Sequence, residues 1–177
     1  NFRGKKLFLL LVLVTQMFAP TALVVGIFRE IVKLNLVDTY LALILIYAAF
    51  NMAFSIWILS SFFASIPQEI EEAAWIDGCS RVSTLVRIVL PLSLPGLATA
   101  FIFTFIAAWN EFVIALTLTS SPEQEPLTVG LTALIGFYQV QWQYLFAGSL
   151  IAIVPVVILF GLIEKWLVGG LTAGSVK

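Results

Sequence analysis

Charged side chains make up only 11% of this chain, yet six of them are concentrated in residues 66–91. They are Glu69, Glu71, Glu72, Asp77, Arg81 and Arg87. Carboxylates and guanidinium groups at a surface orient a partner through complementary charge. The sequence has no histidine, no cluster of metal ligands and no pairing of a nucleophile with a base. The chemistry of this segment is therefore binding rather than catalysis.

Further polar side chains lie inside apolar stretches. Glu111 follows Asn110 in AAWNEFVIAL, near the centre of an apolar stretch long enough to span a membrane. A charge at the centre of a membrane costs about 2.5–3.5 kcal/mol. No lysine or arginine lies in the surrounding apolar stretches, so we expect a polar group, water or a second subunit beside this carboxylate. A structural or gating role at a cavity wall is favoured over a proton relay. Asn51 and Ser55 share a helix face at i, i+4, and either hydrogen bonding between helices or substrate contact fits them. These four residues are the candidate translocation-cavity residues.

The elements that hold these residues are membrane helices. Hydrophobic residues make up 61% of the chain, and four segments reach the roughly 20 apolar residues of a spanning helix. They are residues 7–28, 40–63, 92–119 and 144–163. The predicted fold class is all-α, a polytopic membrane helical bundle, with Pro20 kinking the first span.

The distribution of cations predicts the orientation. With a cytosolic N-terminus, the inner segments hold seven cations and the outer ones two. The inner ones are Arg3, Lys5, Lys6, Arg81, Arg87, Lys165 and Lys177, and the outer ones Arg29 and Lys33. Residues 66–91, both ends and the C-terminal tail 164–177 are thus expected in the cytosol. Because the chain starts without methionine, we expect further helices before it.

Residues 66–91 are patterned as two short helices. Ser65 and Gln68 fit a capping box, and Gly78 suits a helix C-terminus. The apolar residues of the first helix are Ile66, Ile70, Ala73 and Ala74. The second helix is expected to begin at Ser80, with an apolar stripe of Val82, Leu85, Val86 and Val89, and to end near Pro91. An acidic first helix is repelled by an anionic lipid surface, so docking to a protein is favoured over lying on lipid.

The same segment carries a family resemblance. It fits the pattern E-A-A-x3-G-x9-I-x-L-P at every fixed position, namely Glu72, Ala73, Ala74, Gly78, Ile88, Leu90 and Pro91. This pattern resembles the signature loop of membrane subunits in bacterial ABC importers. TQMFAP, AWNEF and LVGGLTAGSVK resemble the second permease subunit of carbohydrate importers of the maltose type. Trp75 is a departure, because many relatives carry a smaller residue there.

The resemblance implies a single type I permease domain over residues 1–177, with 66–91 as a coupling loop inserted into an ATPase subunit. The implied coupling residues are Glu69, Glu72, Ala73, Ala74, Asp77, Gly78, Arg81, Ile88, Leu90 and Pro91. The implied partners are a homologous permease, a dimer of ATP-binding subunits, an extracytoplasmic sugar-binding protein and membrane lipid, without nucleic acid. ATP and magnesium would be bound by those partners, with no cofactor in this chain.

Two functions follow as expectations. The first is a subunit of an ATP-driven sugar importer in the bacterial plasma membrane. This subunit is expected not to be an enzyme, because the sequence contains no phosphate-loop motif with which it could hydrolyse ATP. The second is a proton-coupled secondary transporter that uses Glu111 as its relay. A single membrane carboxylate and the lack of a visible internal repeat count against the second.

Overall fold

The computed structural model describes residues 4–136 and 138–173, with side chains described as far as residue 164. Its described elements are helical, apart from an isolated bridge between Ile135 and Val140. In chain order they are α1 Lys5–Thr15, α2 Pro20–Lys33, α3 Tyr40–Ser65, α4 Gln68–Ile76, α5 Arg81–Thr84, the π-helical turn η1 Leu85–Val89, α6 Leu90–Leu92, α7 Leu94–Trp109, α8 Val113–Leu118, α9 Leu127–Gly130, the 3-10 turn η2 Leu131–Leu134 and α10 Trp142–Ala173. The predicted all-α class is confirmed.

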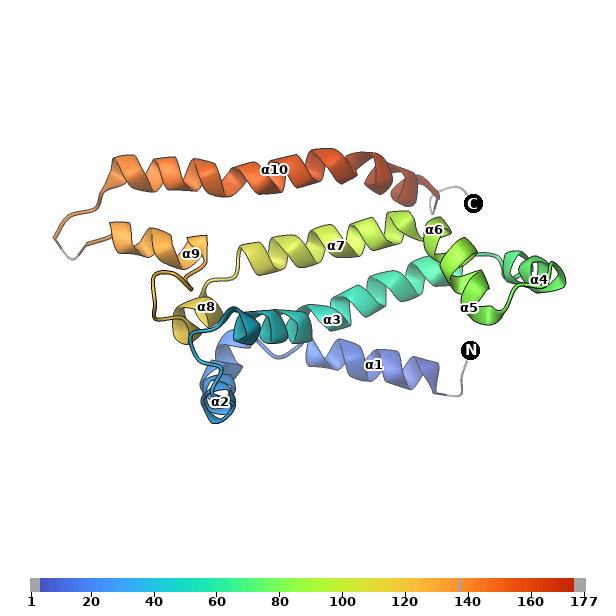
Figure 1. Cartoon of the computed structure of the whole chain (residues 1–177), viewed down its shortest axis with the longest axis horizontal. Coiled ribbons are helices and arrows are strands. Elements are labelled where there is room, and N and C mark those ends of the chain that lie inside the picture. Colours follow the sequence, from blue (N-terminus) through green and yellow to red (C-terminus); the bar gives the residue numbers. More distant parts are fainter. Residues whose placement is uncertain (1–3, 137, 174–177) are drawn as a thin grey trace.

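Three long helices, α3, α7 and α10, run side by side along the molecule, with α7 packed against the other two (Figure 1). They are apolar over most of their length, and a helix satisfies its own backbone groups, as the interior of a bilayer requires. Gly96 allows the close approach of α7 to α3, because a Cβ there would lie 2.4 Å from Cγ of Phe62. Small residues are typical of such interfaces between membrane helices.

Two described helical segments are long and apolar enough to cross a membrane alone, Tyr40–Ser65 and Trp142–Glu164. They contain the expected spans 40–63 and 144–163. Two bent helix pairs pass the same test together, so the described residues hold up to four spans.

The first expected span, residues 7–28, is divided between α1 and α2, which are inclined by 89°. The helix ends at Thr15, and Pro20 is the first residue of α2, where its missing N–H costs nothing. The structure thus has a complete break where we expected a kink. The Nε2 of Gln16 donates to the carbonyl of Phe50 at 2.7 Å and attaches the end of α1 to α3.

The expected span 92–119 is not one helix either. Its main helix, α7, starts at Leu94, after a helical segment inclined by 70°, and ends at Trp109. α8 then begins at Val113. Glu111 therefore lies at a helix break and not within a continuous span.

A buried core forms where α2, α3, α8 and α9 meet, at the end of the molecule away from α4 (Figure 1). Its buried members are Ile31, Ala42, Leu43, Ile46, Ile114, Ala115, Leu118 and Val129.

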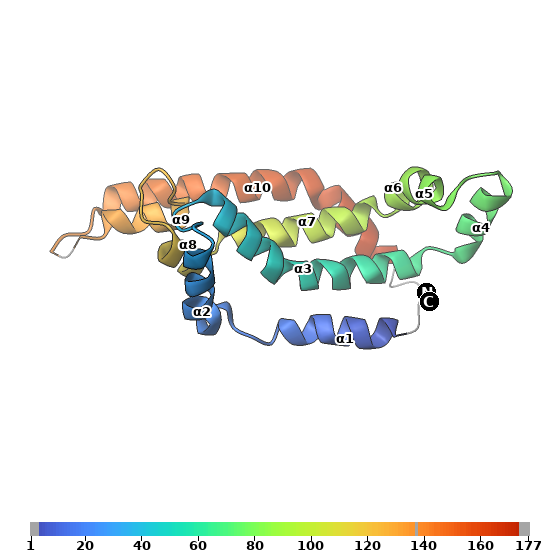
Figure 2. The same cartoon turned by 60° about the horizontal axis from the view of Figure 1, so that its bottom comes forward.

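At the other end, α4, α5 and α6 lie beyond the long helices, and α1 begins and α10 ends on the same side (Figure 2). α10 continues as a helix to Ala173, into the segment expected as a C-terminal tail. Residues 174–177 of that tail lie outside the described residues. The cytosolic location of this end stays a prediction.

Candidate functional site: a projecting helix and a polar cavity

The start of α4 is determined by Pro67. Ile66 precedes a proline and takes an extended conformation, so α3 ends at Ser65. The expected capping box is wrong: Ser65 Oγ donates to the carbonyl of Phe62 at 2.7 Å, and no side chain caps the start of α4. Gln68 Nε2 instead donates to Glu72 Oε1 one turn later, at 3.0 Å.

The end of α4 is a glycine-terminated turn, as predicted. Gly78 has φ +84°, in the left-handed region. The N–H of Cys79 donates to the Ala74 carbonyl at 2.9 Å, and that of Gly78 to the Trp75 carbonyl at 3.1 Å. This is the hydrogen-bond pair of a Schellman motif, which stops the helix sharply. Any residue with a Cβ would be strained there by about 1–2 kcal/mol.

The two alanines of the signature point in different directions. Ala74 is 3% exposed, so it packs within this chain and is not free for an approaching partner. Ala73 is exposed together with Glu69, Glu72 and Ile76, at spacing i, i+3, i+4 and i+7. We call these four residues, with the neighbouring Asp77, the α4 outer face.

Ile76 was missed by the sequence reasoning. Its side chain is 87% exposed, although isoleucine is among the residues most often buried. The signal was available, since Ile76 continues the helical spacing that starts at Glu69. An exposed apolar residue among carboxylates gives the α4 outer face an anchor as well as charge.

The second short helix begins where predicted, because Ser80 Oγ accepts from the N–H of Ser83 at 3.2 Å. Its expected apolar stripe is only partly buried within this chain. Val89 is buried, whereas Val82, Leu85 and Val86 are exposed.

The helical path passes through η1 and α6 and stops at Leu92, one residue beyond Pro91. Of the remaining signature residues, Ile88 and Leu90 are partly buried and Pro91 is exposed.

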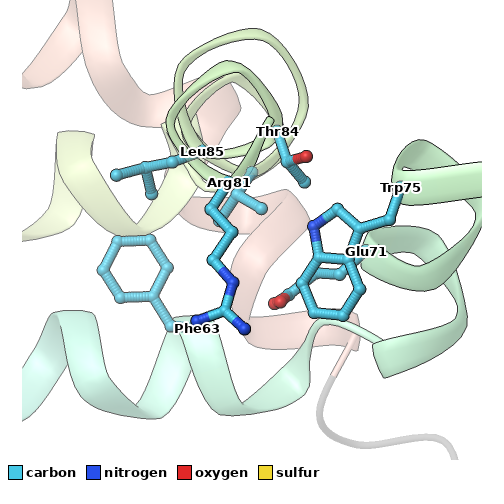
Figure 3. Close-up of a pocket in the computed structure, with 7 residues that line it drawn as sticks. Phe63, Glu71, Trp75, Arg81, Thr84 and Leu85 are labelled. Carbon is cyan, nitrogen blue, oxygen red and sulfur yellow. The ribbon is translucent and has the colours of Figure 1, made fainter. Parts of the chain in front are cut away.

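Arg81 and Trp75 connect the two short helices. The Arg81 guanidinium lies 5.8 Å from the centre of the Trp75 ring, within cation–π range. Figure 3 shows Arg81 extending between Phe63 of α3 and the side chains of Trp75 and Glu71 of α4. The implied coupling residue Arg81 therefore has a partner within its own chain.

Glu111 is the cap of α8. Its Oε1 accepts from the N–H of Ile114 at 2.8 Å, and its Oε2 from the N–H of Ala115 at 3.0 Å. Tyr47 on α3 donates its hydroxyl to Oε2 at 2.9 Å. A negative charge at a helix start is stabilised by the helix dipole. The polar neighbour expected for Glu111 is thus Tyr47 together with two backbone N–H groups.

A cavity of about 190 Å³ lies beside this cap. Two of the four candidate cavity residues line it, Asn51 and Glu111, together with Gln16 and Tyr47. Sequence reasoning missed Tyr47, although it lies four residues before Asn51 on the same helix face.

The other two candidates lie elsewhere. Ser55 shares a 3.0 Å hydrogen bond with Thr104, which joins α3 to α7. Asn110 is exposed, and its Nδ2 donates to the carbonyl of Ile106 in its own helix at 2.9 Å.

The loops at the end away from α4 are tied together by Asp38. Its Oδ1 accepts from the N–H groups of Ser120 at 2.8 Å and Ser121 at 3.0 Å, and the Ser121 hydroxyl donates to Oδ2. The bond from the Ser120 N–H, followed by those from Ser121, lowers the pKa of the Asp38 carboxyl below its ordinary value of 3.8.

Residues 1–172 match the sequence family described as binding-protein-dependent transport system inner membrane component. The chain is 41% identical to the trehalose/maltose transport system permease protein MalG of Thermococcus litoralis, covering 100% of this chain and 64% of that protein. It is 38% identical to the sulfoquinovosyl glycerol transport system permease protein SmoH of Agrobacterium fabrum, covering 100% of this chain and 62% of that protein.

The fold resembles a chain of the crystal structure of a bacterial ABC transporter involved in the import of the acidic polysaccharide alginate. The TM-score is 0.71 at 26% identity, over 94% of this chain and 63% of the other. The chain thus spans less than two thirds of the length of these relatives. The match over residues 1–172 shows that the chain belongs to the family of binding-protein-dependent transport system inner membrane components.

Proposed function

We propose that the protein is a translocation-pathway subunit of an ATP-driven ABC importer for a sugar or a related carbohydrate. The observation that carries the proposal is the α4 outer face. It presents three carboxylates, a small residue and an exposed isoleucine on a short helix beyond the ends of the long helices. Such a helix can enter a cleft of a partner and transmit its movement.

The joints around α4 suit this mechanical role. Pro67 and the Schellman turn at Gly78 separate α4 from its neighbours without long flexible loops. The cation–π contact between Arg81 and Trp75 resists a change of angle between α4 and α5. Movement of α4 would therefore reach α7 through the helical segment Arg81–Leu92.

The partners proposed on this basis are a homologous permease, two ATP-binding subunits and an extracytoplasmic sugar-binding protein. ATP and magnesium would be bound by the ATP-binding subunits, and this chain would perform no catalysis. The named relatives transport trehalose or maltose and sulfoquinovosyl glycerol, which favours a carbohydrate as cargo. We place the protein in a bacterial plasma membrane with α4 on the cytosolic side.

The geometry of Glu111 does not favour a proton relay. Both carboxylate oxygens accept hydrogen bonds that hold the start of α8 in place. Protonation would weaken those bonds, so a relay would disturb the fold in every cycle. We therefore assign Glu111 a structural role in the wall of the cavity.

Reconstitution of the full-length protein with its partners tests the function. Vesicles should accumulate labelled sugar when ATP and the binding protein are supplied, with or without a proton gradient. Uptake driven by a proton gradient without ATP, and lost in Glu111→Gln, would contradict the proposal.

A further inference from the structure

A second cavity, of about 520 Å³, lies between the end of α3 and the two short helices. Its lining residues are Phe63, Glu71, Trp75, Arg81, Thr84, Leu85 and Val89. One part of the wall is apolar and aromatic, and another carries one cation and one anion (Figure 3). The cavity lies on the side of α4 that faces α3, so it is distinct from the α4 outer face.

The two charged side chains, Arg81 and Glu71, both line this pocket. Arg81 and Glu71 form no ion pair within 4.0 Å in the described part of the chain. Glu71 accepts no hydrogen bond from any described residue, and the described contact of Arg81 is the Trp75 ring. Within the described residues, the pocket thus presents a positive and a negative group that do not pair with each other, and a ligand that carries both charges can contact each of them.

The pocket lies at the end of a helix that is long and apolar enough to span a membrane. Phe63 belongs to the last turns of α3, an apolar helix that ends at Ser65. Leu85 and Val89 belong to the helical segment that forms a bent span with α7. Aromatic and arginine side chains at this level are typical of the membrane–water interface.

We propose that this pocket binds the headgroup of a phospholipid that carries both a phosphate and a primary ammonium, that is, a phosphatidylethanolamine-type lipid. Arg81 would bind the phosphate through charge-assisted hydrogen bonds. Glu71 would accept from the ammonium, and the Trp75 ring would add a cation–π contact. Leu85, Val89 and Phe63 would contact the glycerol and the upper acyl chains.

The charge pattern selects this headgroup over an anionic one. A phosphatidylglycerol headgroup can satisfy Arg81 but presents no cation to Glu71. The proposal does not depend on what the protein transports or on its ATPase partner.

Native mass spectrometry of the full-length protein in mild detergent, with equal amounts of the two lipids, provides the test. The wild type should retain the ethanolamine lipid in preference to the glycerol lipid. Arg81→Gln should lower retention of both by about threefold, the effect of one partly exposed charge contact. Glu71→Gln should lower retention of the ethanolamine lipid alone, by about threefold, and so remove the preference.

Matched controls make the same charge changes outside the pocket. Arg87→Gln and Glu69→Gln lie on the same short helices but do not line the cavity, and both should retain lipid like the wild type. Equal retention of the two lipids by the wild type, a preference for the anionic lipid, or an equal loss in the controls would overturn the proposal.

A second measurement needs no variant, in case Arg81→Gln does not fold. A photoreactive ethanolamine phospholipid should label the wild-type protein within residues 63–89. Competition by unlabelled ethanolamine lipid should remove this label, and glycerol lipid should not. Labelling confined to other segments would refute the site.

Discussion

Removal of the Glu111 carboxylate should destabilise the protein strongly, because this side chain satisfies two buried backbone N–H groups. Ile114 and Ala115, which donate them, are 1% and 0% exposed. A buried donor without a partner costs about 1–3 kcal/mol. Glu111→Ala leaves two such donors, so we expect a loss of about 2–6 kcal/mol. Glu111→Gln keeps one acceptor oxygen, so it should lose about half as much.

Thermal unfolding of the purified full-length protein measures this effect. At about 2–4 °C per kcal/mol, Glu111→Ala should lower Tm by roughly 5 °C or more. The matched control is Asn110→Ala, because the neighbouring Asn110 is exposed and bonds only within its own helix. Tyr47→Phe removes one bond to the carboxylate but keeps both N–H groups satisfied, so its loss should be small. A Glu111→Ala variant as stable as Asn110→Ala would refute the capping role.

Three further predictions concern the helix interface, the outer loops and the end of α4. Gly96→Ala should lower the free energy of unfolding by about 1–3 kcal/mol, because the new methyl group forces the Phe62 ring away. Gly26→Ala is the matched control and should be neutral or stabilising, because the space around Gly26 is open. Equal Tm values for the two variants would contradict the close packing of α7 against α3. Asp38→Asn should lower Tm at neutral pH. Because the pKa of the Asp38 carboxyl is lowered in the folded state, the difference in Tm between the wild type and this variant should shrink as pH falls below about 3.8. A difference in Tm that is constant with pH would be inconsistent with a charge effect. Gly78→Val should uncouple ATP hydrolysis from transport in the reconstituted complex. Gly78→Asn should do so less, because asparagine tolerates positive φ better than valine. Normal coupling in the valine variant would contradict the need for a glycine turn at the end of α4.

The features that could be predicted from sequence depend on local chemistry. Gly78 marks the end of α4 because only glycine accepts its φ without strain, and Ser80 marks the next helix because its hydroxyl caps it. The apolar lengths of residues 40–63 and 144–163 sufficed to find the two described helical segments that are long and apolar enough to cross a membrane alone. These inferences need no knowledge of neighbouring helices.

The features that could not be predicted depend on distant contacts. No glycine or proline marks the break after Trp109, and it is stabilised by Glu111 together with Tyr47, 64 residues earlier in the chain. The sequence does not distinguish Ala74 from Ala73 as a residue open to a partner. The packing of α4 against α5 decides which of the two is buried. The serine at 65 fits a capping box by spacing, but its hydroxyl bonds back into α3 instead.

Site-directed cross-linking at Ala73 tests whether the α4 outer face contacts an ATPase subunit. The measurement uses the assembled complex with Cys79 replaced by serine, so that Ala73→Cys is the only thiol in the described part of this chain. Ser120→Cys is an exposed control at the opposite end of the molecule. A short thiol cross-linker should join Ala73→Cys to the ATPase subunit and leave Ser120→Cys unjoined. No cross-link from Ala73→Cys in a complex that hydrolyses ATP would contradict this contact.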